Sequence, residues 1–172
     1  LVFDLSSVAK GYAVDAVSNY LLANNFNNYL IDIGGEIAAN GSSKTGLWTI
    51  GVKDPQLLQQ KISFTVPNSN NFIGVATSGD YLNFKYIDGQ LVSHSIDPRT
   101  TKSKDNNILS VTVLDEISVA RADAFATAFN VMNLDESIEL SESLNIKIKI
   151  IYVSDGLVEF FESKSWQNMK YD

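Results

Sequence analysis

The segment IKIKIIYVSDGLVEFF, residues 146–161, decides the fold class. Two apolar runs, Ile146–Val153 and Leu157–Phe161, flank the dipeptide Asp155-Gly156, which favours a tight turn between antiparallel strands. The segment therefore predicts a hairpin that ends the folded part of the chain.

The same pattern occurs earlier, where Phe84–Ile87 and Leu91–Ser95 flank Asp88-Gly89 and predict a second hairpin. Further apolar or alternating runs predict strands. These are Leu1–Leu5, Tyr29–Ile33, Leu47–Val52, Ile62–Val66, Phe72–Ala76 and Ile108–Leu114.

Apolar residues recur at helical spacing in three segments, which predicts helices over Val8–Ala23, Val119–Met132 and Ser137–Leu144. Strands outnumber helices, and hairpins outnumber strand–helix–strand units. We therefore expect an α+β fold with a largely antiparallel sheet and packed helices. The absence of a linker or repeat predicts a single domain over residues 1–172.

The composition excludes several classes of protein. The chain is 45% hydrophobic and 19% charged, which is typical of a globular protein. Its net charge of −7 argues against a nucleic-acid partner, because such surfaces normally carry a basic excess. The lack of cysteine removes disulfides, thiolate nucleophiles and sulfur-ligated metals. No apolar run approaches the ~18 residues that cross a bilayer.

Asp123 and Thr127 are one turn apart on a predicted helix and therefore share a face. A carboxylate and a hydroxyl are hard oxygen ligands that suit magnesium better than zinc. The residues alone leave a second reading open, in which Asp123 is a packing residue bonded to a neighbouring hydroxyl or amide.

Three other features are candidates for chemistry. His94, the only histidine, is either a general base or an ordinary surface or packing residue. Lys10 follows Ser6-Ser7 at a predicted helix start, which is either a phosphate-binding helix end or a simple capped helix. Gly34-Gly35 either allows a ligand close to the backbone or only bends the sheet.

Six motifs in order give the chain a more specific resemblance. They are DLSSVAKGYAVD (4–15), IDIGGEI (31–37), a tryptophan strand ending at Asp54-Pro55, ATSGDY (76–81), SHSIDPRT (93–100) and ADAFATAFNVM (122–132). This series resembles the C-terminal part of the ApbE family of FAD:protein FMN transferases. The resemblance implies a T-fold-related architecture.

The resemblance also implies a reaction and the residues for it. Family members split FAD with Mg²⁺, attach FMN through a phosphoester to a Thr or Ser of an acceptor protein, and release AMP. By the family pattern, the metal ligands are Asp123, Thr127 and the backbone carbonyl of Ser7. Asp4, Lys10 and Ile96 correspond to FAD-contacting positions, and His94 corresponds to the base that deprotonates the acceptor hydroxyl.

The chain departs from the family pattern in the residues of two motifs and in length. DLSS replaces the common DLGG, and Thr100-Thr101-Lys102-Ser103 replaces Thr-Gly-x-Pro, which indicates a different loop. Family members carry roughly as much chain again before this point, including part of the flavin pocket. We therefore expect an N-terminal segment of the same protein as a partner.

Two other functions stay open. One is a non-catalytic FAD-binding protein, and the other is a pyrophosphatase that yields free FMN and AMP. The resemblance places the protein in the bacterial periplasm or cell envelope, lipid-anchored through the segment that precedes Leu1.

Overall fold

The computed structural model describes residues 5–53, 60–65, 71–79, 85–87, 90–92 and 95–169. Its main feature is a six-stranded sheet in the order β1-β2-β7-β12-β13-β14, in which every neighbouring pair is antiparallel. The strands are β1 (Tyr29–Ile33), β2 (Glu36–Asn40), β7 (Ile73–Gly79), β12 (Ile108–Asp115), β13 (Lys147–Ser154) and β14 (Leu157–Glu162). This confirms the expected α+β class and the terminal hairpin.

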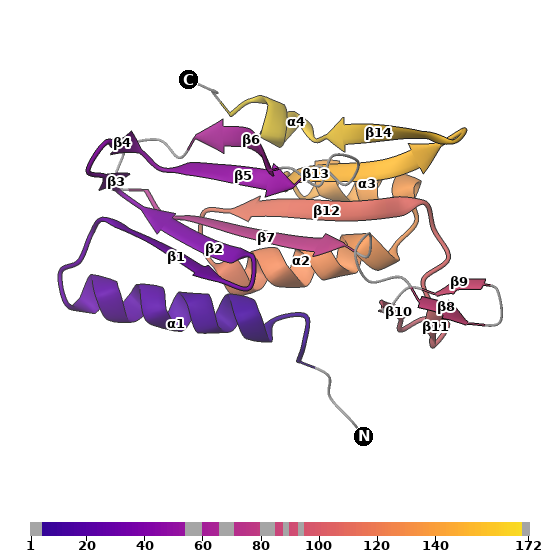
Figure 1. Cartoon of the computed structure of the whole chain (residues 1–172), viewed down its shortest axis with the longest axis horizontal. Coiled ribbons are helices and arrows are strands. Elements are labelled where there is room, and N and C mark those ends of the chain that lie inside the picture. Colours follow the sequence, from indigo (N-terminus) through magenta and orange to yellow (C-terminus); the bar gives the residue numbers. More distant parts are fainter. Residues whose placement is uncertain are drawn as a thin grey trace.

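One layer covers each face of the six-stranded sheet. Helices α1 (Ala9–Ala23) and α2 (Val119–Val131) lie on one side of it in Figure 1. Helix α3 (Leu134–Ser143) follows α2, and the short α4 (Lys164–Gln167) lies beside β5 and β6. Four two-stranded sheets complete the fold. They are β3 (Ser42–Ser43) with β4 (Gly46–Leu47), β5 (Thr49–Lys53) with β6 (Gln60–Thr65), β8 (Lys85–Ile87) with β9 (Gln90–Val92), and β10 (Ile96–Asp97) with β11 (Lys102–Ser103).

Successive side chains of a strand point to opposite faces of the sheet, so the hydrophobic core is divided between these two faces. Val113 packs with Phe129 of α2 on the helical face, whereas its neighbour Leu114 packs with Trp166 of α4 on the other. A third cluster joins α1 to the sheet and to α2 through Val14 and Val119. The position of α2 is thus fixed by the sheet below it and by α1 beside it.

The sequence predictions differ from the structure at a few elements. Strand β2 was not predicted, because Ala38 and Ala39 carry little strand preference; both are fully buried. Helix α3 begins at Leu134 rather than Ser137, because Asn133 and Glu136 form a capping box.

Three further differences concern short elements. The four-residue helix α4 was not predicted. The predicted strand Leu47–Val52 is divided between β4 and β5. Leu5 lies outside any strand, and the rest of the predicted strand Leu1–Leu5 falls outside the described residues.

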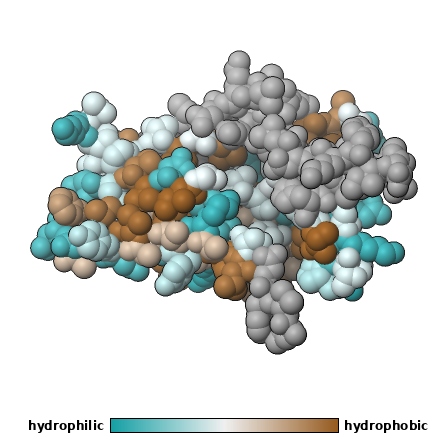
Figure 2. All heavy atoms as spheres, turned by 60° about the horizontal axis from the view of Figure 1, so that its bottom comes forward, coloured by the Kyte–Doolittle hydropathy of each residue, from teal (hydrophilic) through white to brown (hydrophobic). Residues whose placement is uncertain are grey.

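The surface on the α1 side carries exposed apolar side chains, and Figure 2 shows apolar areas gathered there. They include Val17, Leu22 and Phe26. Among the described residues, no helix has the length and apolar character to span a membrane.

Candidate active site

The first turn of α1 lies directly against α2 at Gly11. A Cβ at this position would lie 2.6 Å from both the Ala120 Cα and the Val119 carbonyl oxygen, so only glycine fits without a shift. The Gly11 N–H donates a 3.0 Å hydrogen bond to Asp123 Oδ2. The motif around Lys10-Gly11 is thereby brought to the predicted metal-ligating residue, 112 positions further along the chain.

Asp123 is a buried carboxylate, with 5% of its surface exposed. Burial raises the pKa of Asp123, while the Gly11 hydrogen bond and the nearby charge of Lys10 act in the opposite direction. The charged form is therefore incompletely compensated by the protein. A cation beside Asp123 would supply the missing stabilisation.

Lys10, next to Gly11 in α1, contacts the β1–β2 hairpin. Its Nζ lies 2.7 Å from Oε2 of Glu36 in an ion pair. Glu36 is 1% exposed, and burial raises its pKa against the opposing effect of Lys10. Asp123 also raises the pKa of Glu36, so the ammonium of Lys10 lies within the field of two carboxylates.

The hairpin that positions Glu36 depends on Gly34 and Gly35. Ile33 pairs with Glu36, which leaves these two glycines as a two-residue loop with φ values of +65° and +100°. Positive φ at both positions is the backbone of the tight hairpin turns that favour glycine. The structure thus accounts for this motif as a turn that brings Glu36 to Lys10.

Asp15 fixes the second contact between α1 and α2. Its carboxylate accepts hydrogen bonds from Ser118 Oγ (2.6 Å), Val119 N (2.8 Å) and Ala120 N (3.0 Å). These groups form the N-terminus of α2, where unpaired amides favour a negative charge. An aspartate of one helix therefore caps the other, one turn from the Gly11 crossing.

The remaining predicted ligands lie near this crossing. Thr127 is half-buried, one turn after Asp123 on the same face of α2. Ser7 is half-buried in the turn that leads into α1, four residues before Gly11.

Ile96 lies elsewhere, in the β10–β11 hairpin, where it is 55% exposed. Neighbouring Asp97 and Arg99 form a turn and an ion pair, in which Asp97 accepts from Arg99 N (2.9 Å) and Arg99 Nη2 (3.0 Å). His94 and Asp4 fall outside the described residues, so their proposed roles stay predictions.

The residues at the crossing fit a magnesium ion by donor chemistry. Asp123 provides a buried carboxylate, Thr127 a hydroxyl and Ser7 a carbonyl, all hard oxygen donors. Among the described residues, no three His, Cys, Asp or Glu side chains are grouped so that they could hold a metal ion. Mg²⁺ is usually held by one or two carboxylates together with substrate phosphates, and Asp123 provides such a carboxylate.

Sequence reasoning missed Glu36 and Asp15 as residues of this site. The signal for Glu36 was a charge directly after Gly34-Gly35 in an otherwise apolar segment. Asp15 gave a weaker signal, because its partners at the start of α2 are more than a hundred residues away.

The chain is similar in sequence to known proteins over most of its length. The sequence profile of the ApbE family matches residues 1–152. The FAD:protein FMN transferase of Vibrio cholerae is 37% identical over 165 residues, covering 95% of this chain and 48% of the relative. The Haemophilus influenzae protein of the same name is 36% identical over 89% of this chain and 44% of its own length.

Solved structures show the same fold. The flavin transferase ApbE from Vibrio cholerae superposes with a TM-score of 0.83 at 33% identity, covering 97% of this chain and 52% of that one. The ApbE protein of Thermotoga maritima gives a TM-score of 0.77 at 28% identity, over 96% of this chain and 52% of its own. The chain spans about half the length of the curated relatives that it matches, and it belongs to the ApbE family.

Proposed function

We propose that this chain forms the C-terminal, metal-binding part of an FAD:protein FMN transferase that depends on Mg²⁺. The protein would attach FMN through a phosphoester to a Thr or Ser of an acceptor protein and release AMP. The observation that carries the proposal is the meeting of Lys10, Gly11 and Asp123 where α1 crosses α2.

The start of α1 suits a phosphate. Its N-cap position, Val8, makes no side-chain capping bond, and its first turn holds no acidic residue. The positive end of the helix dipole favours an anion, and Lys10 adds a charge. Lys10 is half-exposed, with 48% of its side chain accessible, so its ammonium remains available to a ligand.

The chemistry joins the acceptor oxygen to phosphorus and breaks one phosphoanhydride bond. The acceptor hydroxyl attacks the FMN phosphorus of FAD, its proton passes to His94, and AMP leaves with the bridging oxygen. Bound magnesium would offset the charge on the phosphates. Lys10 would hold the pyrophosphate, and Asp123, Thr127 and the Ser7 carbonyl would hold the ion.

The flavin pocket is proposed to be completed by chain outside these residues. The relatives are about twice as long as the part matched here, and exposed apolar residues on the α1 side offer a surface for further chain to cover. On the family resemblance we further propose that residues 1–172 act as one domain and that the protein works in the bacterial cell envelope.

The test uses the protein as its gene encodes it, with FAD, Mg²⁺ and an acceptor protein that carries a flavinylation site. We expect AMP release and a fluorescent, covalently flavinylated acceptor. Asp123→Asn should abolish both, whereas the matched control Asp135→Asn, on an exposed residue of α3, should leave both unchanged. Tight FAD binding without AMP would favour the binding-protein function, and free FMN with AMP would favour hydrolysis.

A further inference from the structure

The β10–β11 hairpin is fastened to α2 at its base by Asn130, which is fully buried. Asn130 Oδ1 accepts a 2.7 Å hydrogen bond from Lys104 Nζ, and Asn130 Nδ2 donates to Ser95 Oγ at 3.3 Å. Lys104 N also donates to the Ser95 carbonyl at 2.9 Å, which closes the base of the hairpin. One side chain of α2 therefore holds both ends of the hairpin.

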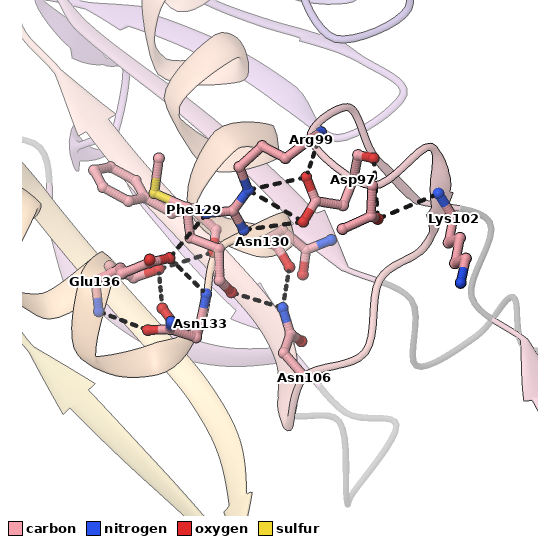
Figure 3. A network of polar contacts seen from close by, with 11 residues as sticks. Asp97, Arg99, Lys102, Asn106, Phe129, Asn130, Asn133 and Glu136 are labelled. Atoms are coloured by element: carbon pink, nitrogen blue, oxygen red, sulfur yellow. Dashed lines mark hydrogen bonds and ion pairs between the residues drawn. The ribbon is translucent and has the colours of Figure 1, made fainter.

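The tip of the hairpin is fastened separately to α3 (Figure 3). The Arg99 guanidinium is held by Asp97 on one side and donates from Nη1 to Glu136 Oε2, at 3.1 Å, on the other. Glu136 is already fixed, because it forms the capping box of α3 with Asn133. The tip is thus anchored to a rigid helix start.

A third contact closes the junction between the two helices. Asn106 Nδ2 donates to the carbonyl oxygens of Asn130 (2.9 Å) and Met132 (2.7 Å), which lie at the C-terminal end of α2. Figure 3 shows Asn106 and Arg99 approaching this junction from the segment that carries the hairpin. The segment is therefore positioned at its base, at its tip and at its exit.

Asn130 shares a helix face with the proposed metal ligands. At 100° per residue, positions 123, 127 and 130 fall within about 60° of one another around α2. Along the axis, Asn130 lies about 10 Å from Asp123, at 1.5 Å per residue. The same face of α2 thus carries Asp123 in its second turn, Thr127 one turn later and the hairpin anchor Asn130 near its C-terminal end.

We propose that Asn130 and Lys104 are positioning residues, which set the β10–β11 hairpin relative to the metal-binding face of α2. The hairpin carries Ile96, and it begins directly after His94 in the chain. In this way α2 would hold the segment that carries Ile96 and follows His94 at a fixed position relative to Asp123. The effect on turnover rests on the proposed function, whereas the anchoring itself does not.

The experiment compares Asn130→Leu, Lys104→Met and the double variant in the protein as encoded. Hydrogen exchange of the amides in residues 95–104 should rise about tenfold or more in each variant, because the hairpin is released while α2 stays folded. FMN transfer should slow about 10- to 100-fold, because a shift of about 1 Å at reacting groups has effects of that size. The magnesium concentration that gives half the maximal rate should not change.

Two further measurements separate positioning from a loss of folding. Lys104 Nζ also donates a 2.8 Å hydrogen bond to the Ile108 carbonyl oxygen, and Asn130 also contacts Ser95. The effect of the double variant should therefore be smaller than the sum of the two single effects, because the two side chains share one contact. Asn130→Asp should restore most of the protection and rate, since its carboxylate accepts from both Lys104 Nζ and the Ser95 hydroxyl. Lys104→Met lies on the hairpin side and tests the anchor even if Asn130→Leu does not fold.

The proposal is overturned if Lys104→Met leaves exchange in residues 95–104 unchanged. It is equally overturned if exchange rises while turnover stays as in the parent. An unmodified protein without transferase activity would refute the proposed function instead, and the exchange data alone would then decide whether Asn130 anchors the hairpin.

Discussion

Gly11→Ala tests the contact on which the candidate site is built. A Cβ at Gly11 would lie 2.6 Å from Ala120 Cα, whereas ordinary contact begins at 3.4 Å. Helix α1 must therefore move away from α2 by about 0.8 Å, or the two helices must distort by as much. The same movement would stretch the 3.0 Å bond from Gly11 N to Asp123 Oδ2 beyond hydrogen-bond range.

The expected effect on the free energy of unfolding follows from three contributions. Overpacking of a tight contact destabilises by about 1–3 kcal/mol. Loss of a hydrogen bond to a carboxylate adds about 1.5–3 kcal/mol. Alanine offsets about 1 kcal/mol, because glycine is a poor helix residue. We expect a net loss of about 1.5–5 kcal/mol, on the order of the effects that unfold marginal proteins.

Urea unfolding followed by circular dichroism measures this difference, with the slope of the transition checked for constancy. The control is Ala16→Gly, at an exposed position of the same helix, which should cost about 1 kcal/mol and so measures the propensity contribution directly. A Gly11→Ala protein as stable as the parent, alongside a normally destabilised control, would refute the close crossing of α1 and α2.

Two further perturbations address the contacts around the site. Asp15→Ala should destabilise the protein by about 2 kcal/mol in chemical unfolding, because the N-terminus of α2 loses its cap; a change below about 0.5 kcal/mol would contradict that role. Hydrogen bonds from Arg99 hold the pKa of Asp97 below its usual value. The ionised Asp97 therefore stabilises the folded protein fully above the unfolded-state pKa of about 3.9. This contribution is lost as the pH falls through the lower pKa of the folded state. Asp97→Asn should therefore lower the Tm near neutral pH, and this difference in Tm should shrink as the pH falls well below about 3.9. A pH-independent difference in Tm would exclude this ion pair as its cause.

The sequence was sufficient for features that depend on local spacing. The Asp155-Gly156 hairpin and the helical face of Asp123 and Thr127 follow from periods of two and 3.6 residues.

Features that depend on distant partners were not accessible in this way. Glu36 becomes part of the site only because a hairpin turn places it against Lys10, 26 positions earlier in the chain. Asn130 looked like one residue of a mostly apolar helix, and its anchoring role depends on Ser95 and Lys104 from another segment. Such pairings are set by tertiary packing, which no local pattern encodes.

Helix α2 is the element through which these separate segments meet. Asp15 caps its first residues, Gly11 binds Asp123 in its second turn, and Asn130 holds the hairpin near its last. These three contacts are made on one rigid helix, so its rotation about its own axis is fixed at both ends. A change that turned α2 would have to break the Asp15 cap and the Asn130 anchor together. The start of α1 and the hairpin with Ile96 are therefore expected to keep their relative positions unless α2 itself unfolds.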